Sequence, residues 1–385
     1  MPASANDSLH GPPPDPQAPT RAGFIAIAGR PNVGKSTLLN RIVGEKLAIA
    51  SPRPQTTRNR ILAVRNVGED QLVLVDTPGL HRPHGRGRSG LNAFMMDEAR
   101  GALADVDVVL VLTDLRALGV RGPGHNAHDE EDLADPGQLL GAEERYVAEE
   151  LATAGKPTIL AVNKIDLLSD KRLLLPLIDA WGKLHPLREI IPISAETGDG
   201  VDHLLDVLRA ALPVGAPLFP ADVLTDRPER FLVAELIREQ VFLKTRQEVP
   251  YAVAVTIDGW QDRAGRRGER VGAVLDATVH VEKESQKKII VGEGGRMIRD
   301  IGTAARQEIG ELLGCGVHLQ LFVRVDPDWT TRAGALRDFG YERHKPEAPT
   351  KRAERRPNKR PERSAPAAAK HQQAPPAHKA TEPPR

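Results

Sequence analysis

Residues 29–36 read Gly-Arg-Pro-Asn-Val-Gly-Lys-Ser, and this stretch decides the fold of the first half of the chain. It follows an apolar run at 24–28 and opens a segment with helical spacing at 35–43. A G-x4-G-K-S pattern between a strand and a helix is typical of a phosphate-binding loop, whose glycines let backbone N–H groups turn inward around phosphates. Lys35 would supply charge to the phosphates and Ser36 a hydroxyl ligand for Mg²⁺. On this segment alone, the alternative is a glycine-rich turn without a ligand.

Three more motifs follow, each at the end of an apolar run. Asp76-Thr77-Pro78-Gly79 would reach the metal through its hydration shell and sense the γ-phosphate through the Gly79 N–H. Asn163-Lys164-Ile165-Asp166 places a carboxylate that can accept two hydrogen bonds from guanine, a donor pair that adenine lacks. Ser194-Ala195-Glu196 can close over the base through the Ala195 N–H. The four motifs together predict a GTP-binding domain with the nucleotide-binding residues Gly29, Arg30, Pro31, Asn32, Val33, Gly34, Lys35, Ser36, Thr37, Asp76, Thr77, Pro78, Gly79, Asn163, Lys164, Asp166, Ser194, Ala195 and Glu196.

The loop at residues 55–58 reads Gln-Thr-Thr-Arg and lies between the first two motifs. A threonine here can complete the Mg²⁺ shell while GTP is bound and let go after hydrolysis. We favour Thr57, with Thr56 as the alternative; an ordinary polar loop is the third interpretation. The predicted metal ligands are therefore Ser36, Thr57 and Asp76, and the predicted catalytic residues are Lys35, Thr57 and Gly79.

Leu80 stands where Ras-type enzymes carry a glutamine that orients the attacking water. Because leucine cannot hydrogen-bond to water, hydrolysis is slow or the stabilising charge comes from elsewhere. Asn32 could help to hold K⁺ beside the phosphates, or it could serve only to order the loop. The sequence leaves both interpretations open.

Composition narrows the class of protein. Cys315 is the single cysteine in 385 residues, so a disulfide-stapled scaffold is excluded, and a small packed residue is its simplest interpretation. No run reaches the about 18 apolar residues that a membrane span needs, and the first twenty residues lack the basic start of a secretory signal. The net charge of +1 conceals a tail at 342–385 with 12 basic against 5 acidic residues. We expect a cytoplasmic protein with an acidic body and a basic, proline-rich tail.

Apolar runs at 71–75, 107–113, 158–162 and 190–193 alternate with helical stretches such as 142–153 and 201–212. This alternation predicts an α/β P-loop domain with a parallel-rich sheet covered by helices. Three prolines in 213–220 indicate a linker. The pattern then changes to α+β: a helix at 229–244, strands at 251–257 and 273–281, an apolar approach at 288–291, a helix at 295–313 and a strand at 317–325. The predicted division is a disordered extension 1–21, a GTPase domain 22–213, a linker 214–228, an RNA-binding domain 229–341 and a disordered tail 342–385.

Residues 289–298 read Ile-Ile-Val-Gly-Glu-Gly-Gly-Arg-Met-Ile, which resembles the KH signature of an apolar approach, a G-x-x-G loop and a helix. Such a loop presses against a sugar-phosphate backbone while a neighbouring apolar groove receives unstacked bases. From 263 to 299 there are nine basic and five acidic residues, so phosphate binding there should depend on salt. The alternative is a glycine turn at a helix entry with solvated basic residues. The predicted RNA-binding residues are Lys287, Lys288, Gly292, Glu293, Gly294, Gly295, Arg296 and Arg299.

Taken together, the stretches GRPNVGKST, SPRPQTTRNRI, VDTPGLH, LAVNKID, PISAETG and TDRPERFLVAELIRE resemble the Era family of bacterial GTPases over residues 22–341. The resemblance implies hydrolysis of GTP to GDP and phosphate with Mg²⁺, a type II KH domain after the GTPase domain, and a monomer. It also implies binding of 16S ribosomal RNA near its 3′ end during small ribosomal subunit assembly. The chain departs from the family at Glu293, where a basic residue is usual, in an insertion near 115–141, and in the tail.

Two other functions stay open. One is a peripheral membrane signalling GTPase for which RNA binding is incidental, the basic tail contacting the inner face of the cell membrane; the tail could equally bind RNA or only solubilise the chain. The other is a constitutive RNA-binding protein that uses nucleotide structurally. A tRNA-modifying GTPase is disfavoured, because that class should end in a cysteine motif and this chain ends in Pro-Pro-Arg.

Overall fold

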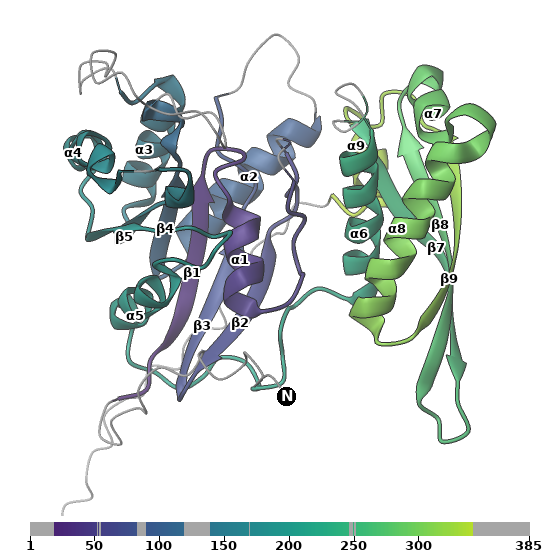
Figure 1. Ribbon diagram of the computed structural model, residues 1–385, viewed down its shortest axis with the longest axis horizontal. Coiled ribbons are helices and arrows are strands. Elements are labelled where there is room, and N and C mark those ends of the chain that lie inside the picture. Colours follow the sequence, from purple (N-terminus) through teal and green to yellow (C-terminus); the bar gives the residue numbers. More distant parts are fainter. Residues whose placement is uncertain are drawn as a thin grey trace, which may run out of the picture. The chain divides into compact units, whose positions relative to one another are not determined.

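A computed structural model of the chain describes residues 19–51, 53, 55–82, 90–118, 139–168, 170–245, 249 and 252–341. The insertion is described only at its two ends, and the tail after Tyr341 lies outside the described residues. Within the described part the strands form one six-stranded and one three-stranded sheet (Figure 1).

The first sheet has the order β2-β3-β1-β4-β5-β6. Its strands are β1 (Ala22–Gly29), β2 (Ile61–Val67), β3 (Asp70–Asp76), β4 (Val108–Thr113), β5 (Thr158–Val162) and β6 (Glu189–Pro192). All but β2 are parallel, which confirms the parallel-rich sheet predicted from the apolar runs. β2 pairs antiparallel with β3, from Ile61 opposite Asp76 to Val67 opposite Asp70, and is an edge strand that the sequence pattern did not predict.

Helices cover both faces of this sheet (Figure 1). α1 (Lys35–Val43) and α5 (Val201–Ala211) pack on one face, and α2 (Gly90–Asp105), α3 (Ala142–Ala154) and α4 (Leu175–Leu184) pack on the other. β1 supplies both cores, since Ile25 and Ile27 point to one face and Ala26 and Ala28 to the other. The carboxyl ends of the parallel strands therefore meet at one edge, followed by the four motifs and the short turns η1 (Leu115–Leu118), η3 (Ile165–Leu167) and η4 (Lys171–Leu174).

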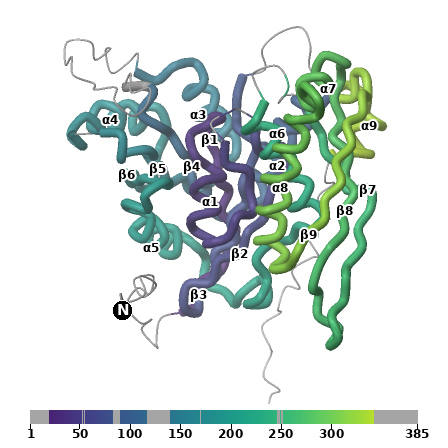
Figure 2. The backbone as a smooth tube through the Cα atoms, turned by 45° about the vertical axis from the view of Figure 1, so that its right-hand side comes forward, coloured from purple at the N-terminus to yellow at the C-terminus, as the bar shows by residue number. Residues whose placement is uncertain are grey.

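The second sheet has the order β7-β8-β9 and is covered by α6 and α8 (Figure 2). Its elements are α6 (Glu229–Lys244), β7 (Ala254–Ala264), β8 (Arg270–Val281), α7 (Glu284–Val291), η6 (Glu293–Gly295), α8 (Arg296–Leu313), β9 (Gly316–Val325) and α9 (Ala333–Asp338). The helices α6 and α8 and the three strands follow in the predicted order, whereas α9 was not predicted. β7 pairs antiparallel and β9 parallel with β8. Cys315 packs at the edge of this core, as predicted.

Two local predictions in this part were wrong. Residues 288–291 are the last turn of α7 rather than an extended approach, because the Gln286 side chain accepts hydrogen bonds from the Glu282 and Lys283 N–H groups and caps a helix there. The strand predicted at 251–257 begins three residues later and runs to Ala264, into a long hairpin with β8.

The proline-rich segment predicted as a linker is hydrogen-bonded to the first sheet. The Gly215 N–H donates to the Thr20 carbonyl at 2.9 Å, and the Leu218 and Phe219 N–H groups donate to Gln71 Oε1 at 2.7 and 2.9 Å. Further along, the Val64 N–H donates to the Leu224 carbonyl at 2.8 Å. The segment is thus tied to the β2–β3 edge, while the domain boundaries themselves stay a prediction.

Candidate nucleotide and RNA sites

The phosphate-binding loop is built around two glycines in the left-handed region. Gly29 has φ +134° and Gly34 φ +102°. A Cβ on Gly29 would lie 2.3 Å from the Leu112 carbonyl oxygen, and one on Gly34 would lie 2.2 Å from Asn163 Nδ2. The backbone of β4 thus closes the space at Gly29 and the Asn163 amide closes it at Gly34, so a side chain at either position would displace its neighbour as well as strain the backbone.

Lys35 lies at the base of this loop and is buried. Its ammonium group donates hydrogen bonds to the Gly29 and Arg30 carbonyls at 3.3 and 2.9 Å. Burial lowers the pKa of Lys35 to about 8. An anionic phosphate beside the ammonium group would offset this desolvation, because an opposite charge favours the protonated amine.

The three predicted metal ligands converge. Ser36 Oγ lies 2.8 Å from Asp76 Oδ2 and 2.9 Å from Thr57 Oγ1, and Thr57 Oγ1 lies 2.9 Å from the same Asp76 oxygen. All three side chains are buried, and Asp76 Oδ1 has no hydrogen-bond partner among the described residues. Burial raises the pKa of Asp76, a cost that a cation would remove. An all-oxygen set with one unsatisfied carboxylate oxygen fits Mg²⁺.

Thr56 has a different environment from Thr57. Its carbonyl oxygen accepts a hydrogen bond from the Arg238 guanidinium of α6. The structure thus places the Thr57 hydroxyl beside the other two predicted metal ligands, Ser36 and Asp76.

On the guanine side, Asn163 joins three motifs. Its Nδ2 donates to the Val33 carbonyl at 2.7 Å, and its Oδ1 accepts from the Lys164 and Ala195 N–H groups, both at 2.8 Å. The Ala195 N–H, which we expected to contact the base, is therefore committed to Asn163. For the Ala195 N–H to contact the base, its hydrogen bond to Asn163 Oδ1 would have to break or become bifurcated. Asp166 is exposed on η3, where its carboxylate is accessible to a base.

A cavity of about 340 Å³ brings these parts together, within the range of ligand pockets. It is lined by phosphate-loop residues including Asn32 and Lys35, by Thr56 and Thr57, and by Gly79. Lys164 and Glu196 from the guanine-side motifs complete the lining. Residues from each of the four motifs thus surround one space.

Asp114 is a site residue that the sequence reasoning missed. It follows β4, its side chain is 1% exposed, and it lies 3.0 Å from both Arg30 Nη2 and Lys164 Nζ. Arg30 also pairs with Glu144 of α3 at 2.9 Å, and Lys164 Nζ donates to the Asn32 carbonyl at 2.9 Å. Asp114 therefore links the phosphate loop to the guanine-specificity motif. The available signal was a carboxylate directly after an apolar run, the same rule that identified Asp76.

Leu80 is fully buried in the core beneath α2 and α3, and its N–H donates to the Gly29 carbonyl at 3.0 Å. Its side chain therefore points away from the phosphate site. Neither chemistry nor position lets it orient water.

The second candidate site lies between α7 and α8. Gly292, Gly294 and Gly295 have φ +69°, +59° and +75°. A Cβ on Gly292 would lie 2.7 Å from Met297 Cβ, whereas one on Gly294 or Gly295 would meet nothing within 4 Å. Glu293 and Gly294 are exposed. The loop is therefore open to a ligand, with Lys287, Lys288, Arg296 and Arg299 on the flanking helices.

A groove of about 480 Å³ runs beside this loop. Of the predicted RNA-binding residues, Gly295 and Arg299 line it; the sequence reasoning missed the rest of its lining, Ile298, Gly302, Thr303, Arg306, Leu319 and Leu321. Helical spacing from Arg299 to Thr303 and Arg306 was the available signal on α8.

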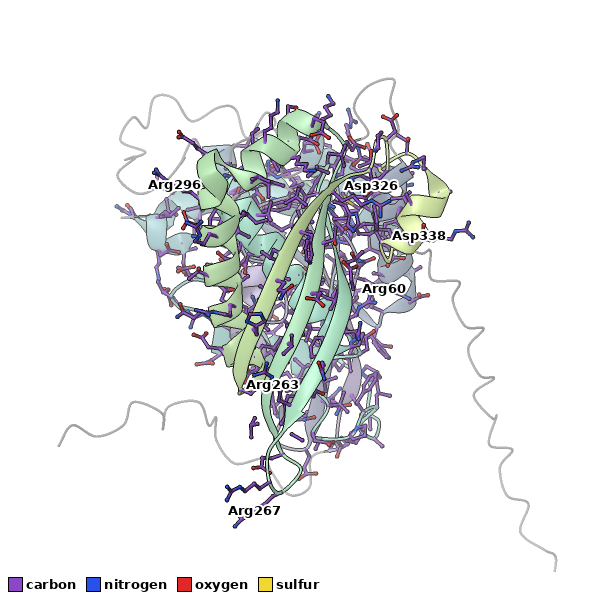
Figure 3. The ribbon with its side chains drawn as sticks, turned by 90° about the vertical axis from the view of Figure 1, so that its right-hand side faces the viewer. Arg60, Arg263, Arg267, Arg296, Asp326 and Asp338 are labelled. Carbon is purple, nitrogen blue, oxygen red and sulfur yellow. The ribbon has the colours of Figure 1, made fainter. Side chains whose placement is uncertain are left out.

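The basic residues counted between 263 and 299 do not form one patch. Arg267 lies at the tip of the β7–β8 hairpin, whereas Arg296 lies at the start of α8 (Figure 3). The twelve residues of β8 separate the hairpin from the helices that flank the glycine loop, a distance of about 40 Å at about 3.3 Å per residue. The charge beside the groove is thus smaller than the sequence count suggests.

Comparisons with known proteins agree with this geometry. The family model described as 50S ribosome-binding GTPase matches residues 24–164, and the KH domain model matches residues 248–330. The chain is 48% identical to GTPase Era of Geobacter metallireducens over 324 residues, which cover 84% of this chain and 98% of that protein. GTPase Era of Geotalea uraniireducens is 46% identical over 323 residues, with the same coverage of both chains.

The chain belongs to the Era GTPase family.

Solved Era structures show the same two-domain architecture. A variant of Aquifex aeolicus Era bound to GDP and aluminium tetrafluoride matches with a TM-score of 0.73 and 38% identity, over 83% of this chain and 99% of that one. An Era complex with MgGDPNP and nucleotides 1506–1542 of 16S ribosomal RNA matches with a TM-score of 0.73 and 37% identity, over 84% and 99%. The predicted family and fold class, a P-loop GTPase domain followed by a KH domain, are confirmed. No helix among the described residues of this Era-family chain is long and apolar enough to cross a membrane.

Proposed function

We propose that this Era-family GTPase is a cytoplasmic switch that binds and hydrolyses GTP, and that it binds 16S ribosomal RNA near its 3′ end through the KH groove during small ribosomal subunit assembly. The observation that carries the nucleotide part is the convergence of Ser36, Thr57 and Asp76 beside Lys35. The RNA part is supported by the open glycine loop with its groove, and by the Era structure that contains 16S RNA.

Each motif has a separate task at the nucleotide. Lys35 and the loop N–H groups would hold the phosphates, Ser36 and Thr57 would ligate Mg²⁺ directly, and Asp76 would act through its hydration shell. Mg²⁺ supplies positive charge that stabilises the charge developing on the phosphates. The Gly79 N–H would respond to the γ-phosphate, and Asp166 would select guanine.

We expect hydrolysis in this site to rest on positioning and electrostatics, because the four motifs supply no side chain that we can name as a base for the attacking water. Leu80 is buried, so the stabilising charge must come from the loop, from Lys35 or from a bound cation. Asn32 lines the cavity at φ +66°, a position compatible with a K⁺ ligand. Equal hydrolysis rates in K⁺ and Na⁺ would leave Asn32 with the loop-ordering role.

On the RNA side, the glycine loop would lie against the sugar-phosphate backbone of a single strand. Leu319 and Leu321 of β9 offer apolar surface to unstacked bases, while Arg299 and Arg306 of α8 offer charge to phosphates. The exposed Glu293 opposes this charge at the tip of the loop. The protein would act as a monomer.

The experiment that tests this function is crosslinking and sequencing of the RNA bound with a non-hydrolysable GTP analogue. We expect crosslinks concentrated near the 3′ end of 16S RNA, and their loss in Gly292→Asp and Gly295→Asp. Gly182→Asp, at an exposed and uncrowded glycine of α4, is the matched control and should crosslink like the wild type. Crosslinks spread over unrelated transcripts, or undiminished in both loop variants, would contradict the assignment.

The membrane-signalling alternative depends on the tail at 342–385, which lies outside the described residues. Sedimentation with membranes that survives nuclease treatment would favour it over the ribosomal function.

A further inference from the structure

Arg58 directly follows the metal-site residue Thr57, and its side chain is enclosed by aromatic rings. The residue is 1% exposed, and its guanidinium carbon lies 6.0, 5.9 and 5.8 Å from the ring centroids of Phe242, Trp329 and Tyr341. Its Nη1 donates to the Val253 carbonyl at 2.6 Å and to the Tyr341 hydroxyl at 3.1 Å. We call Phe242, Trp329 and Tyr341 the aromatic cage; all three belong to the KH half of the chain.

A cation in this position is costly unless its surroundings compensate. Burial lowers the pKa of Arg58, because desolvation disfavours the charged form. Aromatic faces attract a guanidinium, and this attraction is strongest when water is excluded. Trp329 and Tyr341 stack on each other at 5.8 Å with an interplanar angle of 17°, so the cage is itself a packed unit. The arginine is therefore held in one place.

The residues around Thr57 alternate between the two halves of the chain. The Thr57 hydroxyl faces Ser36 and Asp76 of the GTPase half. The residue before it, Thr56, accepts a hydrogen bond from Arg238 through its carbonyl oxygen. The residue after it, Arg58, lies in the aromatic cage. Arg238 is itself buried on α6, 5.1 Å from the Phe242 ring. The metal-site hydroxyl is thus fixed between two contacts to the KH half.

The segment that carries Trp329 and Tyr341 also contacts α2, which follows the Asp76–Gly79 motif. Phe94 of α2 packs against Tyr341 with ring centroids 5.9 Å apart, and Leu91 and Leu336 lie in the same buried cluster. The segment at 329–341 therefore contacts both Arg58, which follows Thr57, and α2, which follows the Asp76–Gly79 motif.

The cage is also connected to the RNA groove. Phe242 lies on α6, and α6 packs with α8 in the core of the KH half, where Val233 and Ile237 share a cluster with Ile301, Ala305 and Ile309. The opposite side of α8 carries Arg299 and Arg306, which line the groove. The two packed helices α6 and α8 therefore connect the cage to the surface proposed to bind RNA.

We propose that Arg58 and its aromatic cage couple the nucleotide site to the RNA groove. When Arg58 lies in the cage, it holds Thr57 at the metal. When Mg²⁺ and GTP are bound, Thr57 in turn keeps Arg58 in the cage and α6 in the position that allows RNA to bind. Arg58 is a positioning residue, since it reaches the nucleotide only through Thr57. This inference rests on the proposed function and specifies its regulation. Because coupling is reciprocal, bound RNA must raise the affinity for GTP by the same factor as GTP raises the affinity for RNA.

The test is the ratio of RNA affinities with a non-hydrolysable GTP analogue and with GDP, using a single-stranded RNA of the 16S 3′ end. We expect a wild-type ratio of about 5 to 150, the usual range for coupled sites. In Arg58→Met the ratio should fall to about 1–2, while RNA affinity with GDP and the affinity for GDP itself stay within about threefold. Tyr341→Phe removes one hydrogen bond and keeps the ring, so it should lower the ratio by about threefold.

Arg227→Met is the matched control. Arg227 makes a cation–π contact with Phe231 at 5.0 Å and donates to the Arg60 carbonyl, so its loss removes a similar contact to the same loop, at Arg60 and not at the residues next to Thr57. We expect the wild-type ratio in this variant.

An undiminished ratio in folded Arg58→Met, or an equal loss in Arg227→Met, would overturn the coupling role. If Arg58→Met does not fold, Tyr341→Phe decides, and a wild-type ratio there overturns the role. A wild-type ratio of 1 with tight RNA binding also overturns the coupling but leaves RNA binding intact. Failure of the wild type to bind this RNA in either state would instead contradict the proposed function.

Discussion

The two glycine loops of this chain use the same backbone conformation for different physical reasons. Gly34 at the nucleotide site and Gly294 in the KH loop have φ +102° and +59°. A Cβ on Gly34 would lie 2.2 Å from Asn163 Nδ2, whereas one on Gly294 would meet nothing within 4 Å. The first glycine is required by the protein around it and the second by the ligand expected to approach it. Substitution of Gly34 should therefore damage folding and binding together, whereas substitution of Gly294 should cost only the backbone preference for glycine and should act mainly on RNA binding.

The largest effect is expected for Gly34→Ala. The added methyl group collides with the Asn163 amide. The left-handed backbone of an alanine costs about 1–2 kcal/mol in addition. Because Asn163 holds Val33, Lys164 and Ala195, its displacement should disturb the guanine side too. We expect GDP affinity to fall by at least about 100-fold, equivalent to about 2.7 kcal/mol, in a titration with fluorescent GDP. Affinity within threefold of the wild type would show that the enclosure of this loop is not essential.

Leu80→Gln tests whether a glutamine at this buried position can orient the attacking water. The amide would be placed in a fully apolar core, so the free energy of unfolding should fall by about 1–3 kcal/mol in denaturant titrations. The rate of GTP hydrolysis per folded molecule should not rise, because the side chain points away from the phosphates. A faster rate would contradict the described position of Leu80.

Asp114→Asn should loosen the nucleotide without unfolding the domain. The amide keeps the shape but loses the charge that Arg30 and Lys164 share. We expect GDP to dissociate about tenfold faster, as for a lost hydrogen bond to a charged group, measured by stopped-flow release of labelled GDP. Asp179→Asn, in an exposed i,i+4 pair on α4, is the control and should release GDP at the wild-type rate.

Glu293→Lys examines the open loop. Replacing a negative by a positive charge should raise RNA affinity by about three- to tenfold at low salt and steepen the salt dependence by about one unit, with no change in melting temperature. Glu311→Lys makes the same charge change at the far end of α8 and should have a smaller effect. Equal gains in both variants would mean that only net charge matters.

Gly294→Ala should have a much smaller effect on stability than Gly34→Ala. With open space around the Cβ, only the backbone preference opposes alanine, so we expect a loss of about 1 kcal/mol in the free energy of unfolding and unchanged GDP affinity. A loss as large as that of Gly34→Ala would remove the contrast between the two loops.

The same contrast explains what the sequence could predict. β1, the loop after it and α1 were predictable because each is dictated locally, by a continuous apolar run, by glycines and by helical spacing. β2 was not, since its residues are half-exposed at a sheet edge and gain order only by pairing with β3. α7 was missed because only Ile290 among its apolar residues is buried, and a side-chain cap defines its start.

Site residues divide in the same way. Ser36, Thr57 and Asp76 could be named from their motifs, and their side chains converge in the structure. Asp114 and Arg58 could not, because their roles depend on partners distant in sequence: Lys164 in one case and Tyr341, 283 residues away, in the other. The ion-pair and cage partners become neighbours only when the strands and helices have been assembled.

The most direct test of the central claim, a GTP-controlled KH groove, is the dissociation constant of the wild-type protein for the 16S 3′-end RNA in the two nucleotide states, measured beside Gly295→Asp. Gly295 has open space and aspartate tolerates a left-handed backbone, so this variant should fold and bind GTP normally. We predict that the wild type binds the RNA at least about fivefold more tightly with the GTP analogue than with GDP, and that the variant loses this tight binding. Equal affinity in the two nucleotide states, or wild-type RNA binding by the variant, would contradict the account.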